Sequence, residues 1–231
     1  MPLRIFRFRN VTGANAIQIL MVAGLFGMFF LGVLYLQRVL GYDAIETGVA
    51  FLPVSLSIGV LSLGFSPRLI MRFGARATLL PGLVMIVAGL ALFARAPVDG
   101  SYVVDVLPVM FLLGVGAGLS FPALMTLAMS GATQSDSGLA SGLVNTSLQV
   151  GGALGLAVLA TISTTRTETL LADGEGQASA LTGGYHLAFI VAASLVAVAV
   201  VVATTVLQAN PAVEMEVEEE APNAAFVSEA A

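Results

Sequence analysis

Two side-chain amides are the first candidates for binding chemistry, because both fall within a long apolar stretch of the chain. Asn145 and Gln149 lie four positions apart. The same steps of three or four residues continue through the glycines Gly138, Gly142 and Gly152. On a helix this spacing places all five residues on one face, which we call the amide–glycine stripe. An amide donates and accepts hydrogen bonds, so the stripe is predicted to face either a substrate or another helix.

Residue types that carry out catalysis or bind metals are scarce. The chain has no cysteine and a single histidine, His186. A metal site needs several ligands, and covalent catalysis needs a nucleophile beside a base. The glycines lack the preceding strand that a phosphate-binding loop requires. The sequence therefore predicts no enzyme, no metal site, no cofactor and no nucleic-acid partner.

The composition indicates where these residues reside. Hydrophobic residues make up 58% of the chain and charged residues only 10%, and the mean hydropathy is +0.97. So few charged residues cannot coat a soluble domain of this size with polar surface. The predicted solvent of the fold is a lipid bilayer.

The distribution of charge predicts six membrane-spanning helices. A spanning helix needs about 20 mostly apolar residues, and a charge at the bilayer centre costs about 2.5–3.5 kcal/mol on insertion scales. Six stretches without charged residues meet that length, and we place the spans near 14–36, 48–66, 79–94, 106–128, 139–162 and 185–207. Residues 1–13 form a lead-in, and the glutamate-rich residues 209–231 are expected to be a disordered cytoplasmic tail. The fold class is all-α, with one six-helix bundle.

Arginines predict the orientation of the bundle, since basic residues beside short loops favour the cytoplasm. With the N-terminus inside, six arginines are cytoplasmic and three are external. The cytoplasmic set is Arg4, Arg7, Arg9, Arg68, Arg72 and Arg76, and the external set is Arg38, Arg95 and Arg166. An even number of spans then places both termini in the cytoplasm.

Glycines at four-residue spacing predict where helices pack closely. In lipid, small residues let two backbones approach and gain van der Waals contact. The fourth and fifth predicted spans are rich in such pairs, and the packing candidates are Gly114, Gly118, Gly138, Gly142, Gly151 and Gly155.

Several segments together resemble one family. They are Tyr35-Leu-Gln-Arg-Val-Leu-Gly-Tyr42, Gly48-Val-Ala-Phe-Leu-Pro53, Arg72-Phe-Gly-Ala-Arg76, Gly114-Val-Gly-Ala-Gly-Leu-Ser-Phe-Pro122 and Gly138-Leu-Ala-Ser-Gly-Leu-Val-Asn-Thr-Ser147. In this order they resemble the C-terminal half of a major facilitator superfamily transporter, in particular the fourteen-helix drug/proton antiporter branch. The resemblance covers about residues 2–208.

The resemblance implies a cytoplasmic latch between the second and third helices. The family carries a Gly-x-x-x-Asp-Arg-x-Gly-x-Arg-like motif there, and Arg72, Gly74 and Arg76 match it. Pro67 and Met71 stand where the glycine and the acidic residue would be. The nearby Arg68 adds positive charge to the same segment. Anchoring of these arginines at lipid headgroups is the alternative.

The resemblance also implies a central substrate cavity, with the fifth helix near the interface to another half. The candidates for cavity lining are Asn145, Gln149, Gln37, Tyr35 and Gln18. None of the predicted spans contains Asp, Glu, Lys or Arg, although proton coupling needs a titratable group in the membrane. The remaining titratable residue, His186, begins the last span near the outer interface, where a solvated histidine is expected. The coupling residues are therefore expected in a missing N-terminal half.

Three functions remain open on the sequence. The first is the C-terminal half or fragment of a multi-pass plasma-membrane transporter that exports small amphipathic drugs by antiport with protons. The second is a truncated membrane module without transport activity. The third is a facilitator formed by two copies of this six-helix chain, without proton coupling.

Overall fold

The computed structural model describes residues 9–130 and 137–208. Within these ranges every regular element is helical, and six helical runs are long and apolar enough to cross a membrane. The predicted all-α class and the predicted six spans are confirmed. The elements are α1 (Arg9–Arg38), α2 (Ala44–Ala50), α3 (Leu52–Val60), the π-helical η2 (Leu61–Phe65), α4 (Ser66–Phe73), α5 (Ala75–Phe93), the π-helical η3 (Tyr102–Val106), α6 (Leu107–Met129), α7 (Ser137–Ala172) and α8 (Gln177–Thr205).

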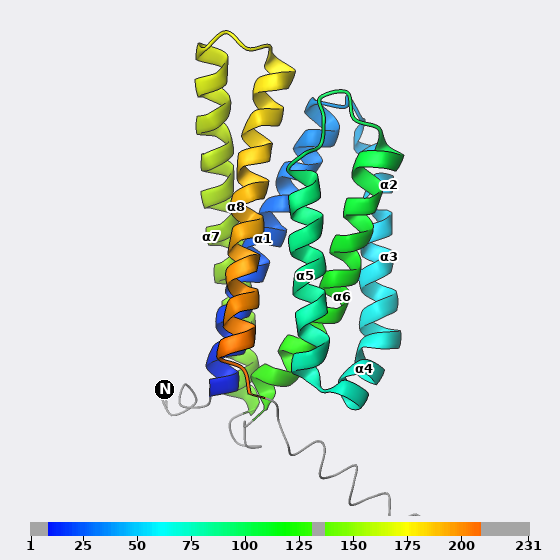
Figure 1. Cartoon of the computed structure of the whole chain (residues 1–231), viewed down its shortest axis with the longest axis vertical. Helices are drawn as coiled ribbons and strands as arrows, with labels where there is room; N and C mark the ends of the chain where they lie inside the picture. Colours follow the sequence, from blue (N-terminus) through cyan, green and yellow to red (C-terminus); the bar gives the residue numbers. More distant parts are fainter. Residues whose placement is uncertain (1–8, 131–136, 209–231) are drawn as a thin grey trace, which may run out of the picture.

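The spans alternate in direction along the bundle. The connections 39–43, 94–101 and 173–176 lie at one end, which we call the distal end (Figure 1). The start of α1 and the end of α8 lie together at the opposite, terminal end (Figure 1). There the Asn10 side chain accepts a hydrogen bond from the Gln208 backbone N–H at 2.9 Å. An even number of spans requires this arrangement.

Several helices are longer than the predicted spans. The described part of α1 begins at Arg9, within the predicted lead-in, and α7 continues to Ala172 although the span was predicted to end at 162. At 1.5 Å per residue the 36 residues of α7 extend about 54 Å, against about 30 Å of hydrocarbon. The α7–α8 hairpin accordingly rises beyond the other helices at the distal end (Figure 1). The predicted acidic tail lies outside the described residues.

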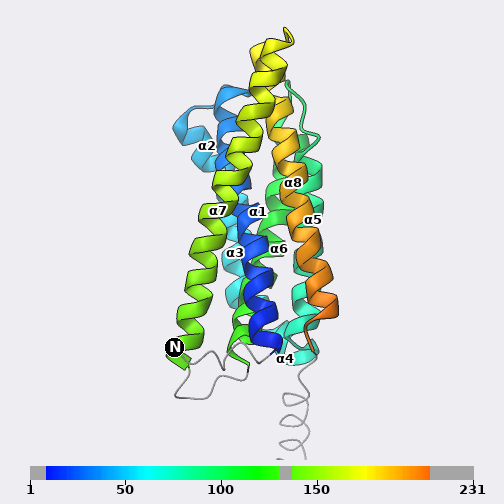
Figure 2. The same ribbon diagram turned by 90° about the vertical axis from the view of Figure 1, so that its left-hand side faces the viewer.

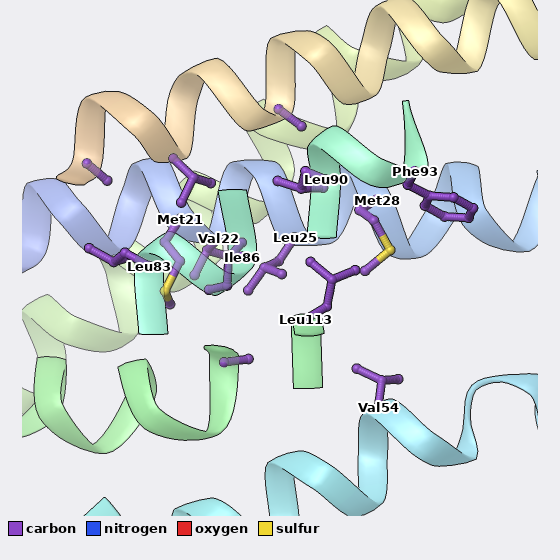
Figure 3. Packing of buried hydrophobic residues seen from close by; sticks show 14 of the residues in the cluster. Met21, Val22, Leu25, Met28, Val54, Leu83, Ile86, Leu90, Phe93 and Leu113 are labelled. Carbon is purple, nitrogen blue, oxygen red and sulfur yellow. The ribbon is translucent and has the colours of Figure 1, made fainter. Parts of the chain in front are cut away.

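One large apolar core joins all six spans. Met21, Leu25 and Met28 of α1 lie among side chains of α5, with Leu113 of α6 and Val54 of α3 beside them (Figure 3). All of these side chains are buried. Figure 2 shows α1 running between α7 and α8 through the middle of the bundle. The core therefore positions α1 as the central helix, against which α7 is fixed.

Glycines allow the closest helix contacts. A Cβ on Gly151 would lie 2.8 Å from the Ile19 carbonyl oxygen, and a Cβ on Gly155 would overlap the backbone of Ala23. Both partners are on α1, four residues apart, as the two glycines are on α7. In the same way a Cβ on Gly114 would lie 2.8 Å from the Val54 carbonyl oxygen, so α6 holds α3. Backbone contact of this kind leaves no room for a side chain.

The second span begins with a hydrogen-bonded cap at the distal end. The Asp43 carboxylate accepts the backbone N–H groups of Ile45 and Glu46, each at 2.8 Å. In return, Glu46 Oε2 accepts the backbone N–H of Asp43 at 3.0 Å. This reciprocal capping box satisfies backbone donors that the first helical turn leaves unpaired. It also fixes the position of the Glu46 carboxylate.

Gly74 makes the sharp turn between α4 and α5. Its φ is +84° and its ψ is 157°, a conformation that is nearly restricted to glycine. Its backbone N–H donates to the Ile70 carbonyl at 2.8 Å, which closes α4. The glycine of the Arg72–Arg76 motif is thus required by the turn.

Substituting Gly74 with alanine is therefore expected to destabilise the fold by about 1–3 kcal/mol, because a Cβ strains this backbone conformation. Thermal unfolding of the purified chain in detergent measures the effect. Gly59→Ala is the matched control, since Gly59 is helical and a Cβ there would meet nothing within 4 Å. Equal melting temperatures for the two variants would contradict the assigned turn.

Candidate functional site

Four of the five residues of the amide–glycine stripe lie on an open face of α7, and the fifth, Gly152, is buried. Gly138, Gly142, Asn145 and Gln149 are exposed, and a Cβ on either of these glycines would meet nothing within 4 Å. The Asn145 amide donates to the Ser141 carbonyl of its own helix at 3.0 Å. Gly138 and Gly142 therefore do not pack against any described helix of this chain, contrary to the packing role expected for them. The buried face of α7 is a different one, which carries Gly151 and Gly155.

A second open stripe lies on α1 and meets the first. Phe26, Phe30 and Gln37 are exposed and follow helical spacing. The Phe26 ring lies against Gly152, the last member of the amide–glycine stripe, where a Cβ would be 3.0 Å from the ring. We call the two stripes together the open face. Its surface combines glycines, amides and aromatic rings, which suits a substrate or another helix better than lipid alone.

Two of the predicted cavity residues are buried instead of facing this surface. Gln18 is only 3% exposed, and its amide donates to the Val144 carbonyl of α7 at 3.1 Å. Tyr35 is 1% exposed, and its hydroxyl donates to the Pro97 carbonyl at 2.6 Å. Each side chain joins its helix to a neighbouring segment. Asn145, Gln149 and Gln37 are therefore exposed, but Gln37 lies at the distal end of α1 and the two α7 amides lie nearer the terminal end, while Gln18 and Tyr35 are part of the packing.

A polar contact between α1 and α7 was not anticipated from the sequence. Asn15 is buried, and its Oδ1 accepts a hydrogen bond from the Ser147 hydroxyl at 2.8 Å. Its amide donates to the Val11 carbonyl at 2.8 Å. Asn15 precedes Gln18 by three residues, so both amides fall on one side of α1. A pair of amides at helical spacing in an apolar span is the sequence signal that could have predicted this contact.

Removing the Ser147 hydroxyl tests this contact. Ser147→Ala leaves the Asn15 oxygen buried without its hydrogen bond, and the expected loss of stability is about 1 kcal/mol. Thr146→Val is the control, because Thr146 is exposed and, among the described residues, its hydroxyl bonds only the Gly142 carbonyl of its own helix. In a double-mutant cycle, Asn15→Leu together with Ser147→Ala should cost less than the two single changes combined. Strict additivity in detergent melting experiments would show that the two side chains do not interact.

The arginines of the predicted latch make three different contacts at the terminal end. Arg76, at the start of α5, donates to the Thr204 carbonyl in the last turn of α8 at 2.7 Å. A cation there satisfies an unpaired carbonyl and the negative end of the helix dipole. Arg72 lies over the Phe73 ring, 5.2 Å from its centre, and Arg68 donates to the Gly64 carbonyl. Of these three arginines, only Arg76 links two spans in the described part of the chain.

The distal loop before η3 is anchored by two side chains. The Pro97 carbonyl accepts the Tyr35 hydroxyl, and Nε2 of His186 lies 2.7 Å from the Ala96 carbonyl oxygen. The Tyr35 ring also meets Phe93 edge-on, with ring centres 5.5 Å apart. His186 therefore has a structural contact. No group of three or more metal-binding side chains occurs among the residues described.

Comparison with known proteins gives a family match. The model of the Major Facilitator Superfamily matches residues 2–156. A puromycin resistance protein of Streptomyces alboniger is 39% identical over 166 residues, which cover 71% of this chain and 33% of that protein. A cephamycin export protein of Amycolatopsis lactamdurans is 33% identical over 200 residues, which cover 86% of this chain and 40% of that protein.

A further relative is the tetracenomycin C resistance and export protein of Streptomyces glaucescens. It is 29% identical over 182 residues, which cover 78% of this chain and 33% of that protein. The chain therefore spans between about a third and two fifths of the length of these curated relatives. Their names describe resistance and export, and members of this superfamily are membrane transporters rather than enzymes.

Proposed function

The chain belongs to the Major Facilitator Superfamily, and from this premise we propose that it is the C-terminal six-helix part of a secondary-active multidrug efflux transporter. It would export small amphipathic compounds from the cell across the plasma membrane, with both termini in the cytoplasm. The resistance and export functions of its relatives support this proposal. The chain spans only about a third to two fifths of the length of these relatives, which supports a second, N-terminal set of helices in the whole transporter.

The observation that supports this proposal most directly is the open face of the bundle. Transporters of this family use two six-helix bundles that rock around a site near the midplane. Each bundle then needs a rigid interior and one surface turned to its partner. Here the glycine contacts of Gly151 and Gly155 and the Asn15–Ser147 hydrogen bond fix α7 to α1. The open face remains, and Asn145 and Gln149 supply hydrogen-bonding groups on it.

Proton coupling is assigned to groups outside the six spans. The predicted spans contain no acidic residue, and a coupled antiporter needs a titratable group in the membrane. An N-terminal half would supply that group and the opposite wall of the cavity. The contribution of this chain is then the C-terminal wall of an alternating-access cavity, with Arg76 holding α5 to α8 at the cytoplasmic end.

Export by the joined protein tests the proposal. The chain is expressed with the helices encoded immediately upstream, in a host sensitive to ethidium, and ethidium efflux is followed by fluorescence. The proposal predicts efflux that stops when the proton gradient is collapsed. Efflux by the six-helix chain alone would favour a facilitator built from two copies. Absence of efflux from a correctly inserted joined protein would favour a non-transporting module.

A further inference from the structure

A groove at the distal end lies apart from the amide–glycine stripe. It has a volume of about 420 Å³ and is lined by Tyr42, Ile45, Glu46, Val49, Ala50 and Tyr102. These residues come from the loop after α1, from the short helix α2 and from the start of η3. The volume falls within the range of about 300–1,000 Å³ that is usual for sites of drug-sized ligands.

The lining combines one carboxylate with two aromatic rings and an aliphatic wall. Glu46 is exposed and uses Oε2 to accept the Asp43 backbone N–H at 3.0 Å, and in the described part of the chain it forms no ion pair. Tyr42 and Tyr102 also line the groove, and the face of a tyrosine ring attracts cations through its electron density. Ile45 and Val49 are large apolar side chains that remain exposed.

The walls of the groove are held in place by hydrogen bonds. The Tyr102 hydroxyl donates to the Ala50 carbonyl at 2.9 Å, which ties η3 to α2. The Tyr42 backbone N–H donates to the Leu36 carbonyl at 3.0 Å, a turn that Gly41 allows with its φ of +75°. The capping box holds Glu46. A ligand would therefore meet side chains that are already positioned, which lowers the cost of binding.

We propose that this distal groove binds an organic cation with an apolar body, at a site separate from the open face. The positive charge lies beside the Glu46 carboxylate and the tyrosine rings, and the apolar body covers Ile45 and Val49. An anion of the same shape is excluded because it would meet the carboxylate. A zwitterionic lipid headgroup fits less well, since its phosphate would approach Glu46. The proposal rests on the groove alone and does not depend on export.

Equilibrium binding of radiolabelled tetraphenylphosphonium to the full chain in phosphatidylglycerol nanodiscs tests the charge. Glu46→Gln is expected to weaken binding about two- to fivefold, the size expected for one exposed charge. Glutamine still accepts the Asp43 N–H, so the capping box and the fold are retained. Asp173→Asn removes the same charge from the α7–α8 connection at the same end and should leave the affinity unchanged. Equal affinity of wild type and Glu46→Gln, or equal loss in both variants, would overturn the proposal.

Two further arms test the rings and the ligand class. Tyr42→Leu should weaken binding about two- to fivefold while Tyr42→Phe retains it, because the ring and not the hydroxyl meets the cation. Tetraphenylborate, the anion of matching shape, should show no saturable binding to wild type, because the Glu46 carboxylate repels it. Binding that disappears in phosphatidylethanolamine nanodiscs would overturn the assignment to a soluble cation and give the groove to the lipid amine.

Discussion

Replacing Gly155 with leucine is expected to prevent α7 from docking on α1 and so to abolish the folded six-helix bundle. A Cβ at this position would overlap the backbone of Ala23, and a backbone cannot swing aside as a flexible side chain can. Overpacking in a close-packed interior costs about 1–3 kcal/mol and sometimes more. The measurements are the yield of monodisperse protein in mild detergent and its melting temperature.

Gly142→Leu is the matched control for this change. It lies on the same helix, and a Cβ there would meet nothing within 4 Å. The chain should therefore fold as well as wild type with leucine at this position. Equal loss of folded protein in both variants would mean that α7 does not pack on α1 through the Gly151–Gly155 face.

Combining Asn145→Leu with Gln149→Leu is expected to lower ethidium efflux by the joined transporter about tenfold at unchanged membrane level. The two amides lie on the open face and make no described contact with another helix, so their loss leaves the bundle intact. Two hydrogen bonds to a substrate, each worth about 0.7 kcal/mol, account for a factor of that size.

Thr161→Val serves as the control for the amide variant. Thr161 is an exposed polar residue of α7 outside the three- and four-residue spacing of the stripe, and its hydroxyl bonds the Ala157 carbonyl of its own helix. Efflux by this variant should match wild type. If the amide variant exports normally while reaching wild-type membrane levels, the two amides take no part in export.

The spans were predictable from the sequence because charge inside a bilayer is costly. The gaps between charged residues located all six. The ends of α7 and α8 were not predictable in this way, since both helices continue through polar residues beyond the hydrocarbon. Arg166 and Glu168 lie within α7, and helix propensity, not hydropathy, decides that extension.

The candidate site was predictable only in part, because spacing identifies a helical face without saying what covers it. Gly142 and Gly155 belong to equally good four-residue patterns, yet only Gly155 meets another backbone. Gln18 and Asn145 are both amides in apolar spans, and the crossing of α1 over α7 buries the first and exposes the second. Tyr35 bonds a carbonyl 62 residues away, a contact that no local pattern records.

Cysteine accessibility tests the central claim, that the amide–glycine stripe faces a watery cavity. The chain has no cysteine, so each introduced cysteine is its only thiol and no other thiol of the chain reacts with the label. In native membranes, Asn145→Cys and Gln149→Cys should react with a hydrophilic maleimide, because only a hydrated thiol ionises and reacts. Val198→Cys, on the exposed surface of α8, should stay unreactive in lipid. If the two stripe cysteines were as unreactive as Val198→Cys, the stripe would face lipid and the account would be contradicted.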